Sequence, residues 1–316
     1  MYDVITIGRC GVDVYPLQTG VGLADVETFG KFLGGSPTNV AVAAARHGLR
    51  SAVVTGVGAD PFGEYVRRAI REFGVDDRFV TTVPEAPTPV TFCEIFPPDH
   101  FPIYFYRGEH PPDLRISPAL LDLEAIGDAS MFWFSLTGLS KEPSASAHAA
   151  ALSARRTGWT VFDLDYRPAL WESREAAHAA AGQALPYANV AVGNLDEVET
   201  AVGVRDPVSA AEALLEAGVR VAIVKMGPEG VFARTSEESC LVKPVEVDVV
   251  NGIGAGDAFG GALCLGLMRG WPLERTVRFA NAAGAFVAAR LACADAMPTT
   301  AEVEDLLSGR ENEVRP

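Results

Sequence analysis

The sequence is poor in basic residues and has no long hydrophobic run. Its 26 lysines and arginines are outnumbered by 41 aspartates and glutamates, which gives a formal net charge of −15. A chain this acidic is not expected to use nucleic acid or an anionic membrane as its main partner. The longest apolar region, residues 279–294, is short and interrupted by Asn281 and Arg290, so we expect no membrane span.

Cysteine is also scarce in this sequence. The five cysteines form no Cys-x-x-Cys pair and are scattered along the chain: Cys10, Cys93, Cys240, Cys264 and Cys293. Such a set argues against a disulfide framework and favours a reducing compartment. A strand-like segment at residues 3–7 begins almost at Met1 and leaves no room for a signal peptide, so we expect a cytoplasmic protein. The five histidines show no spacing that would predict a zinc site.

The pattern that the chain does contain is that of an α/β protein. Its 316 residues, 48% hydrophobic and 21% charged, suit one large soluble domain or two smaller ones. Apolar runs such as residues 221–224 alternate with helical segments from residue 130 onward. This alternation predicts a mostly parallel sheet covered by helices on both faces. We expect a single domain over residues 1–316.

Four strand-like segments in the first third of the chain depart from this alternation. Residues 12–18 and 26–33 follow one another without a helix, and so do residues 88–96 and 101–107. They are better explained as an antiparallel sheet that stands apart from the main layer. The sequence therefore predicts a small β-sheet lid, with strands drawn from about 12–33 and 88–107.

The most informative stretch is the glycine-rich run at residues 251–257, between a strand-like segment and a helix-length segment of small residues. Glycines at a strand-to-helix turn let backbone N–H groups approach a ligand, and a helix start attracts anions. We predict that the N–H groups of Gly254, Ala255 and Gly256 bind an anion. The carboxylate of Asp257 makes sense there if it takes a proton from a hydroxyl that attacks the bound anion.

A second glycine-rich turn, Gly34-Gly35, opens another helix-like segment. An ordinary capped helix start explains it, but Asn39 in the first helical turn could also hold sugar hydroxyls. Asp13 follows the first strand and would lie at its carboxyl end, where open α/β sheets bind ligands. A solvated loop aspartate is the alternative for that residue.

Asn194 follows an apolar strand, and Glu197 lies three residues later. A capping box explains this pair fully, because each side chain can bond the backbone N–H of the other residue. The same two residues could organise a hydrated Mg²⁺, which is held through few protein oxygens and its own waters. The two interpretations do not exclude each other.

Two further sets of residues have a structural and a functional explanation. The turn that holds Lys225, Gly227 and Gly230 suits nucleotide phosphates or ribose, and equally a plain hairpin. Arg107 and Arg167 lie at strand ends in apolar surroundings. Each arginine is either the partner of a structural ion pair or a clamp for a carboxylate or phosphate.

The turns at residues 34–41 and 254–257, with Asn194 and Glu197 between them, resemble the ribokinase/PfkB family of carbohydrate kinases. The resemblance covers residues 7–292. It implies a ribokinase-like three-layer α/β/α fold with a mostly parallel central sheet and a small β-sheet lid, which often serves for dimerisation. It also implies ATP-dependent transfer of the γ-phosphoryl group to a primary hydroxyl.

The resemblance assigns a role to each candidate residue. Asp257 would be the base, and Gly254, Ala255 and Gly256 would form the anion hole. The substrate-binding residues would be Asp13, Gly34, Gly35, Asn39, Arg107 and Arg167, and the ATP-binding residues would be Lys225, Gly227, Gly230 and Asn281. Asn194 and Glu197 would serve Mg²⁺ and its waters.

Two stretches, at residues 8–13 and 163–171, are similar to members of the family that phosphorylate sugar acids. Arg107 and Arg167 suit such a substrate, because a desolvated carboxylate needs a paired charge. The expected acceptor is 5-dehydro-2-deoxygluconate of inositol catabolism, with 2-keto-3-deoxygluconate as the alternative. A neutral-sugar or nucleoside kinase and a non-catalytic sugar-binding protein are the competing hypotheses.

The sequence departs from the family pattern just before the anion-binding turn. Many members carry Asp-Thr there, and the aspartate helps to hold a monovalent cation. This chain has Asn251 and Gly252 in that region. The loss of the negative ligand argues against a potassium requirement.

Overall fold

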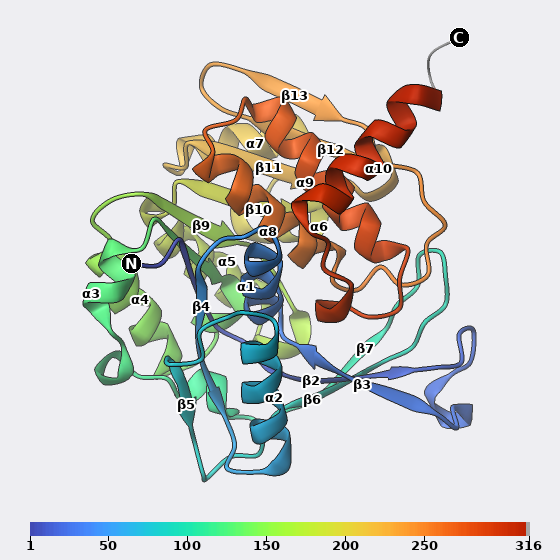
Figure 1. The fold of residues 1–316 in the computed structure, drawn as a ribbon. Coiled ribbons are helices and arrows are strands. Elements are labelled where there is room, and N and C mark those ends of the chain that lie inside the picture. Colours follow the sequence, from blue (N-terminus) through green and yellow to red (C-terminus); the bar gives the residue numbers. More distant parts are fainter. Residues whose placement is uncertain (314–316) are drawn as a thin grey trace.

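A nine-stranded sheet forms the centre of the molecule, in a computed structural model that describes residues 1–313 (Figure 1). Its strands lie in the order β13-β12-β11-β10-β9-β8-β1-β4-β5. Their bounds are β1 (Val4–Ile7), β4 (Ser51–Val57), β5 (Val80–Thr82), β8 (Met131–Ser135), β9 (Trp159–Asp163), β10 (Val190–Asn194), β11 (Val221–Lys225), β12 (Val231–Arg234) and β13 (Ser239–Val242). All pairings are parallel except those of β12 with β11 and β13, so the predicted mostly parallel sheet is confirmed.

Helices cover both faces of this sheet, because its strands are apolar on both sides. One face packs against α1 (Ser36–Arg46), α2 (Pro61–Glu72), α8 (Ala255–Met268), α9 (Leu273–Ala288) and α10 (Thr300–Glu313). The other face packs against α3 (Leu123–Asp128), α4 (Ser144–Ala154), α5 (Arg174–Ala184), α6 (Leu195–Val202) and α7 (Pro207–Glu216). Within the described residues, no helix is both long and apolar enough to cross a membrane.

Small residues bring α1 and α8 into close contact. A Cβ atom added to Gly261 of α8 would lie 2.3 Å from the Cβ atom of Ala43 in α1. One added to Gly260 would lie 2.7 Å from the ring of Trp133. The glycines therefore let the two helices approach, and their first turns come together at the same end of the sheet.

A separate four-stranded sheet extends from one end of the molecule (Figure 1). Its order is β3-β2-β6-β7, with bounds β2 (Gly11–Pro16), β3 (Phe29–Gly34), β6 (Val90–Cys93) and β7 (Ile103–Tyr106). We call this sheet the lid. The prediction of a purely antiparallel sheet was wrong, because β2 and β6 pair in parallel. Each of these two strands follows a parallel core strand, β1 or β5, and therefore leaves the core in the same direction.

Candidate active site

A cavity of about 420 Å³ lies between the lid and the ends of the core elements. Most of the predicted site residues line it: Asp13, Gly35, Asn39, Arg167, Asn194, Glu197, Lys225, Gly227, Gly254, Gly256 and Asp257. Five others do not: Gly34, Arg107, Gly230, Ala255 and Asn281. Ala255 still belongs to the helix start beside the cavity.

The glycine-rich turn opens α8 as the sequence pattern suggests. Gly254 caps the helix with a φ of 87°, a left-handed conformation that favours glycine. The N–H groups of Gly254 and Gly256 donate to no other described residue, and that of Ala255 makes only a long contact of 3.4 Å with the carbonyl oxygen of Gly252. The turn thus presents donors that a bound anion can use.

Asp257 lies in the first turn of α8 and faces the first turn of α1. The side-chain amide of Asn39 donates to Asp257 Oδ2 over 2.8 Å. Burial raises the pKa of Asp257 above its ordinary value, while hydrogen bonds from Asn39 and Ser36 oppose this rise. The other amide atom, Asn39 Oδ1, is buried without a partner, in a residue that is 3% exposed. It can therefore accept a hydroxyl of a ligand beside the base.

Asp13 reaches the cavity from β2 of the lid, and not from a loop at the end of β1 as expected. Burial raises its pKa to about 6, although the hydroxyl of Tyr15 donates to it over 2.7 Å. Gly34 on the neighbouring strand makes room for this carboxylate, since a Cβ atom there would lie 2.0 Å from Asp13 Oδ1. Gly34 thus acts through Asp13 and does not line the cavity itself.

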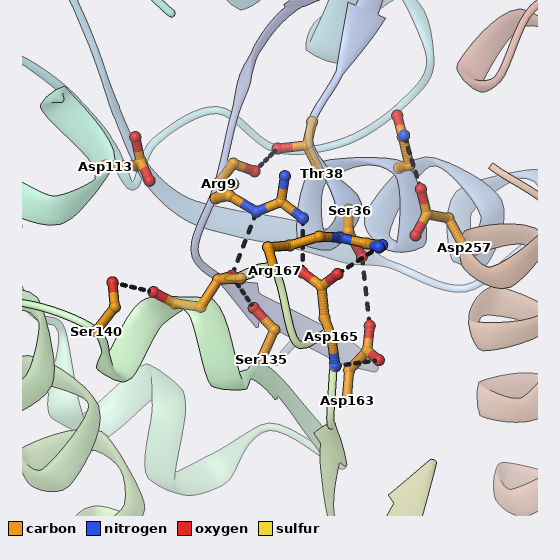
Figure 2. Close-up of polar contacts among 12 residues, drawn as sticks. Arg9, Ser36, Thr38, Asp113, Ser135, Ser140, Asp163, Asp165, Arg167 and Asp257 are labelled. Atoms are coloured by element: carbon orange, nitrogen blue, oxygen red, sulfur yellow. Dashed lines mark hydrogen bonds and ion pairs between the residues drawn. The ribbon is translucent and has the colours of Figure 1, made fainter. Parts of the chain in front are cut away.

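Two arginines meet on one buried carboxylate at the floor of the cavity (Figure 2). Arg9 contacts Asp165 Oδ2 at 2.6 Å, and Arg167 contacts Asp165 Oδ1 at 2.8 Å. Burial raises the pKa of Asp165, but the charges of Arg167 and Arg9 outweigh it and hold the value below the ordinary one. Two cations on one anion leave a net positive charge, which suits an anionic group of a ligand.

Arg107 does not join this pair. It is 8% exposed and forms an ion pair with Asp113 at 2.7 Å, outside the cavity. Figure 2 places Asp113 apart from the cluster around Asp165. Of the two explanations that the sequence left open for Arg107, the structural ion pair is the one that the geometry favours. Arg9 supplies the second cavity arginine instead.

Asp163 and Lys225 bring opposite charges to the ends of β9 and β11. Burial raises the pKa of Asp163 to about 7, and the charge of Lys225 opposes that rise. Ser36 donates to Asp163 over 3.3 Å. Lys225 forms no hydrogen bond or ion pair with another described residue, and its Nζ lies 3.3 Å from where a Cβ atom of Gly256 would be. A free ammonium group thus adjoins the anion-binding turn.

Asn194 and Glu197 form the capping box that the sequence allowed. Asn194 Oδ1 accepts from the N–H groups of Asp196 and Glu197, and Glu197 Oε2 accepts from the N–H of Asn194 over 2.7 Å. Glu197 Oε1 bonds no other described residue and remains available at the cavity wall. One free carboxylate oxygen fits a magnesium ion that keeps most of its waters. No cluster of three acidic, histidine or cysteine ligands occurs among the described residues.

Two residues assigned to the nucleotide have structural contacts away from the cavity. The Asn281 amide donates to the carbonyl oxygen of Lys243 over 2.8 Å. Gly230 closes the β11–β12 hairpin, where a Cβ atom would lie 2.1 Å from the carbonyl oxygen of Val242. The plain hairpin that the sequence allowed is therefore present, and only Gly227 of its two predicted glycines lines the cavity.

Six polar residues of the cavity and its floor were not among the predicted site residues: Arg9, Tyr15, Ser36, Thr91, Asp163 and Asp165. Asp163, Asp165 and Arg167 alternate at the end of β9, and that spacing could have indicated that their side chains gather on one side. Arg9 lies two residues after the buried strand β1 ends, in the position where parallel sheets bind ligands. Nothing in the sequence indicated that Tyr15 would reach back to the core.

Comparison with known proteins gives a consistent result. The family model described as "pfkB family carbohydrate kinase" matches residues 1–300. The chain is 31% identical to the 5-dehydro-2-deoxygluconokinase of Geobacillus kaustophilus, over 98% of this chain and 95% of that protein. It is 33% identical to the enzyme of the same name from Photobacterium profundum, over 99% of this chain and 96% of that protein.

Solved structures show the same fold. A ribokinase II from E. coli, in complex with ATP and Mg²⁺, aligns with a TM-score of 0.88 at 23% identity, over 98% of this chain and 100% of that one. Fructokinase from Xylella fastidiosa with bound ATP aligns with a TM-score of 0.85 at 23% identity, over 98% and 100%. At such identities the likeness concerns the fold alone, and it confirms the predicted ribokinase-like architecture.

Proposed function

This chain belongs to the pfkB family of carbohydrate kinases, and on that premise we propose that it transfers the γ-phosphoryl group of ATP to a primary hydroxyl of 5-dehydro-2-deoxygluconate. The observation that carries the choice of a sugar acid is the pair Arg9 and Arg167 on Asp165, in the same cavity as Asp257. The names of the relatives support the same substrate.

In this proposal Asp257 takes the proton of the acceptor hydroxyl as that hydroxyl attacks phosphorus. Asn39 orients the carboxylate through its 2.8 Å hydrogen bond. The raised pKa of Asp257, caused first by burial, improves it as a proton acceptor near neutral pH. Phosphoryl transfer needs correct placement of the reacting groups and stabilisation of charge more than it needs covalent chemistry. The hydrogen bond between Asn39 and Asp257 would place the base.

The start of α8 and Lys225 would bind the phosphoryl group that is transferred. The N–H groups of Gly254 and Gly256 would stabilise charge on the transferred group, and Lys225 would add a full positive charge beside them. Gly227 lines the cavity, and in this proposal it would adjoin the nucleotide. Glu197, positioned by Asn194, would hold Mg²⁺ through water, and that ion would neutralise charge on the ATP phosphates.

The acceptor would lie between the lid and the core. Asp13 and Asn39 Oδ1 would accept its hydroxyls, close to the backbone of Gly35. Arg9 and Arg167 would bind its anionic end, since the cluster with Asp165 retains net positive charge. This placement leaves a primary hydroxyl free to approach Asp257.

The acceptor is tested by a coupled assay of ADP release. We expect turnover with 5-dehydro-2-deoxygluconate to exceed that with ribose, fructose and adenosine, and 2-keto-3-deoxygluconate is the alternative sugar acid in the panel. Preference for a neutral sugar or a nucleoside would contradict the role given to the two arginines.

The base is tested by Asp257→Asn, which keeps the shape of the side chain and removes its proton-accepting charge. We expect kcat to fall by at least about a thousandfold while the acceptor still binds, because general-base catalysis is lost. Retained turnover would refute the base assignment. A non-catalytic sugar-binding protein, the hypothesis of another class, would show no ADP release in the unaltered chain.

We also propose that the enzyme acts as one kinase domain that pairs with a second copy through the outer face of the lid. Ile103 and Phe105 of β7 face the cavity, so Tyr104 and Tyr106 face outward, and Tyr106 is 67% exposed. Phe92 joins this outer face through edge contacts with the rings of Phe29 and Tyr106. An exposed aromatic face of this kind suits a protein contact.

The dimer is tested by light scattering coupled to size-exclusion chromatography. We expect Tyr106→Lys to convert a dimer of the unaltered chain into a monomer. Tyr187→Lys, at an exposed tyrosine far from the lid, is the control that should leave the mass unchanged. A monomeric unaltered chain would contradict the proposal.

A further inference from the structure

Three contacts connect the lid to the anion-binding turn through Tyr15 and Cys293. The hydroxyl of Tyr15 lies 2.7 Å from Asp13 Oδ2 and 2.9 Å from Cys293 Sγ. Cys293 Sγ in turn lies 3.1 Å from the carbonyl oxygen of Ile253. Asp13, Tyr15 and Cys293 are all buried, with exposed fractions of 7%, 1% and 0%, so bulk water has little access to the hydroxyl of Tyr15 and the thiol of Cys293.

The hydrogens available do not suffice for all three contacts. A tyrosine hydroxyl and a thiol carry one hydrogen each, and an ionised aspartate carries none. Two hydrogens therefore serve three contacts. The carboxylate is the strongest hydrogen-bond acceptor of the three, so Tyr15 donates to Asp13. The thiol of Cys293 can then donate either to the Tyr15 oxygen or to the carbonyl oxygen of Ile253.

Which of these two oxygens the Cys293 thiol donates to depends on the charge of Asp13. Hydrogen bonds in a chain polarise one another, so Tyr15 accepts more strongly while it donates to a fully charged carboxylate. A hydroxyl of the bound sugar that donates a hydrogen bond to Asp13 offsets part of that charge. Tyr15 then becomes a weaker hydrogen-bond acceptor, and the thiol of Cys293 donates to the carbonyl oxygen of Ile253 instead.

The carbonyl of Ile253 belongs to the same peptide unit as the N–H of Gly254. In a trans peptide the two groups point in opposite directions, so a hydrogen bond to the carbonyl fixes the direction of the N–H and strengthens it as a donor. Cys293 also packs tightly here, since a Cβ atom on Gly254 would lie 2.4 Å from Cys293 Sγ. The N–H of Ile253 is fixed separately by Asn251 Oδ1 at 3.0 Å.

We propose that Tyr15 and Cys293 are positioning residues that couple binding of the acceptor at Asp13 to binding of the transferred phosphate at Gly254. The inference rests on the proposed function, because it takes Asp13 as an acceptor contact and Gly254 as a phosphate contact. Its consequence is that each substrate tightens the binding of the other, by the same factor in both directions.

The coupling is measured by isothermal titration calorimetry with adenylyl imidodiphosphate and Mg²⁺, in the absence and presence of saturating acceptor. The acceptor used is whichever sugar the unaltered enzyme phosphorylates in the ADP-release panel. We expect the acceptor to tighten binding of the analogue by about fivefold or more in the unaltered enzyme. Tyr15→Phe and Cys293→Ala should each reduce this factor below twofold, and the double variant should reduce it no further.

Two further variants separate hydrogen bonding from packing. Cys293→Ser keeps one hydrogen at the same position and should retain the coupling. Cys264→Ala removes another fully buried thiol, in the core of α8, and should leave the coupling unchanged even if it lowers stability. Loss of coupling in Cys264→Ala as well, or full coupling in Tyr15→Phe and Cys293→Ala, would overturn the proposal, as would an uncoupled unaltered enzyme.

The two proposals can fail separately. If the enzyme prefers a neutral sugar, the sugar-acid assignment fails, and the coupling is still measured with that sugar. If the sugar acid is phosphorylated but Tyr15→Phe keeps the full coupling factor, the acceptor assignment stands and the role of Tyr15 and Cys293 fails.

Discussion

The side-chain amide of Asn39 donates to Asp257 over 2.8 Å and so joins the first turn of α1 to the first turn of α8. The two residues are 218 positions apart in the chain. A proposed substrate residue and the proposed base therefore hold each other in place, because the small residues between α1 and α8 let the two helices meet.

We expect Asn39→Ala to move the acid limb of the pH profile of kcat/KM upward by about one pH unit. The amide bonds the ionised form of Asp257 and lowers its pKa, so its removal raises that pKa further, and a hydrogen bond to a charged group is worth roughly this much. Asn189→Ala is the control, since that amide side chain accepts from the N–H of Thr160 at the far end of the sheet. An unshifted acid limb would contradict the role of Asn39.

We expect Arg9→Ala and Arg167→Ala to raise the acceptor KM by about 10- to 100-fold, since each would remove a charge-assisted contact to the carboxylate of the proposed sugar-acid substrate. Arg107→Ala should behave differently. It leaves Asp113 buried without its partner, and breaking a buried pair costs about 3–5 kcal/mol of stability. Steady-state kinetics and urea unfolding together check this contrast. A selective effect of Arg107→Ala on acceptor KM would restore Arg107 to the substrate site.

Asp163 makes the stability of the fold depend on pH. Burial raises its pKa in the folded protein from 3.8 to about 7, so the folded state binds more protons than the unfolded state between these values. Its contribution is most favourable below pH 4 and is lost as the pH rises toward 7. We therefore expect Asp163→Asn to gain stability relative to the unaltered chain as pH increases from 4.5 to 7, measured by urea unfolding at several pH values.

Asp165→Asn serves as the opposing case for this experiment. The pKa of Asp165 is held below its ordinary value by Arg167 and Arg9 despite burial. The ionised form therefore favours folding at neutral pH, and its replacement should destabilise the protein there. The loss should shrink as the pH falls from about 4 through the lowered pKa of the folded state, below which the carboxyl is protonated in both states.

We expect kcat to change less than about twofold when potassium is replaced by tetramethylammonium. The turn before α8 is held by hydrogen bonds of Asn251 and does not need a bound cation for its conformation. Asn251 donates to the carbonyl oxygen of Leu291 over 2.8 Å and accepts from the N–H of Ile253 over 3.0 Å. Both ends of its amide are thus in use. A steep potassium dependence of the ADP-release rate would contradict this account.

Much of the architecture was predictable because its signals are local. The capping box that the sequence indicated at Asn194 and Glu197 is present and opens α6. The helix α5 at residues 174–184 has a weaker local signal, since its alanine-rich sequence has little apolar periodicity. The lid was predicted, but its parallel pairing was not, because that pairing depends on two strands brought together by the core.

The candidate site was predictable to the extent that each residue carries its own motif. Asp257, Asn39 and Glu197 lie next to helix starts, and the cavity includes all three. Arg107 and Arg9 are both arginines beside a strand, so only the tertiary fold distinguishes the one paired with Asp113 from the one paired with Asp165. Long-range partners of this kind leave no trace in the local sequence.

The short connection between the core and the lid has a mechanical consequence. Only Gly8, Arg9 and Cys10 separate β1 from β2, and the guanidinium of Arg9 lies 5.7 Å from the ring centre of Phe105 on β7. A swing of β2 away from the core would pull Arg9 off Asp165 and leave that carboxylate with Arg167 alone. Opening the lid to release the product would thus also weaken the contacts that we propose for the product's carboxylate.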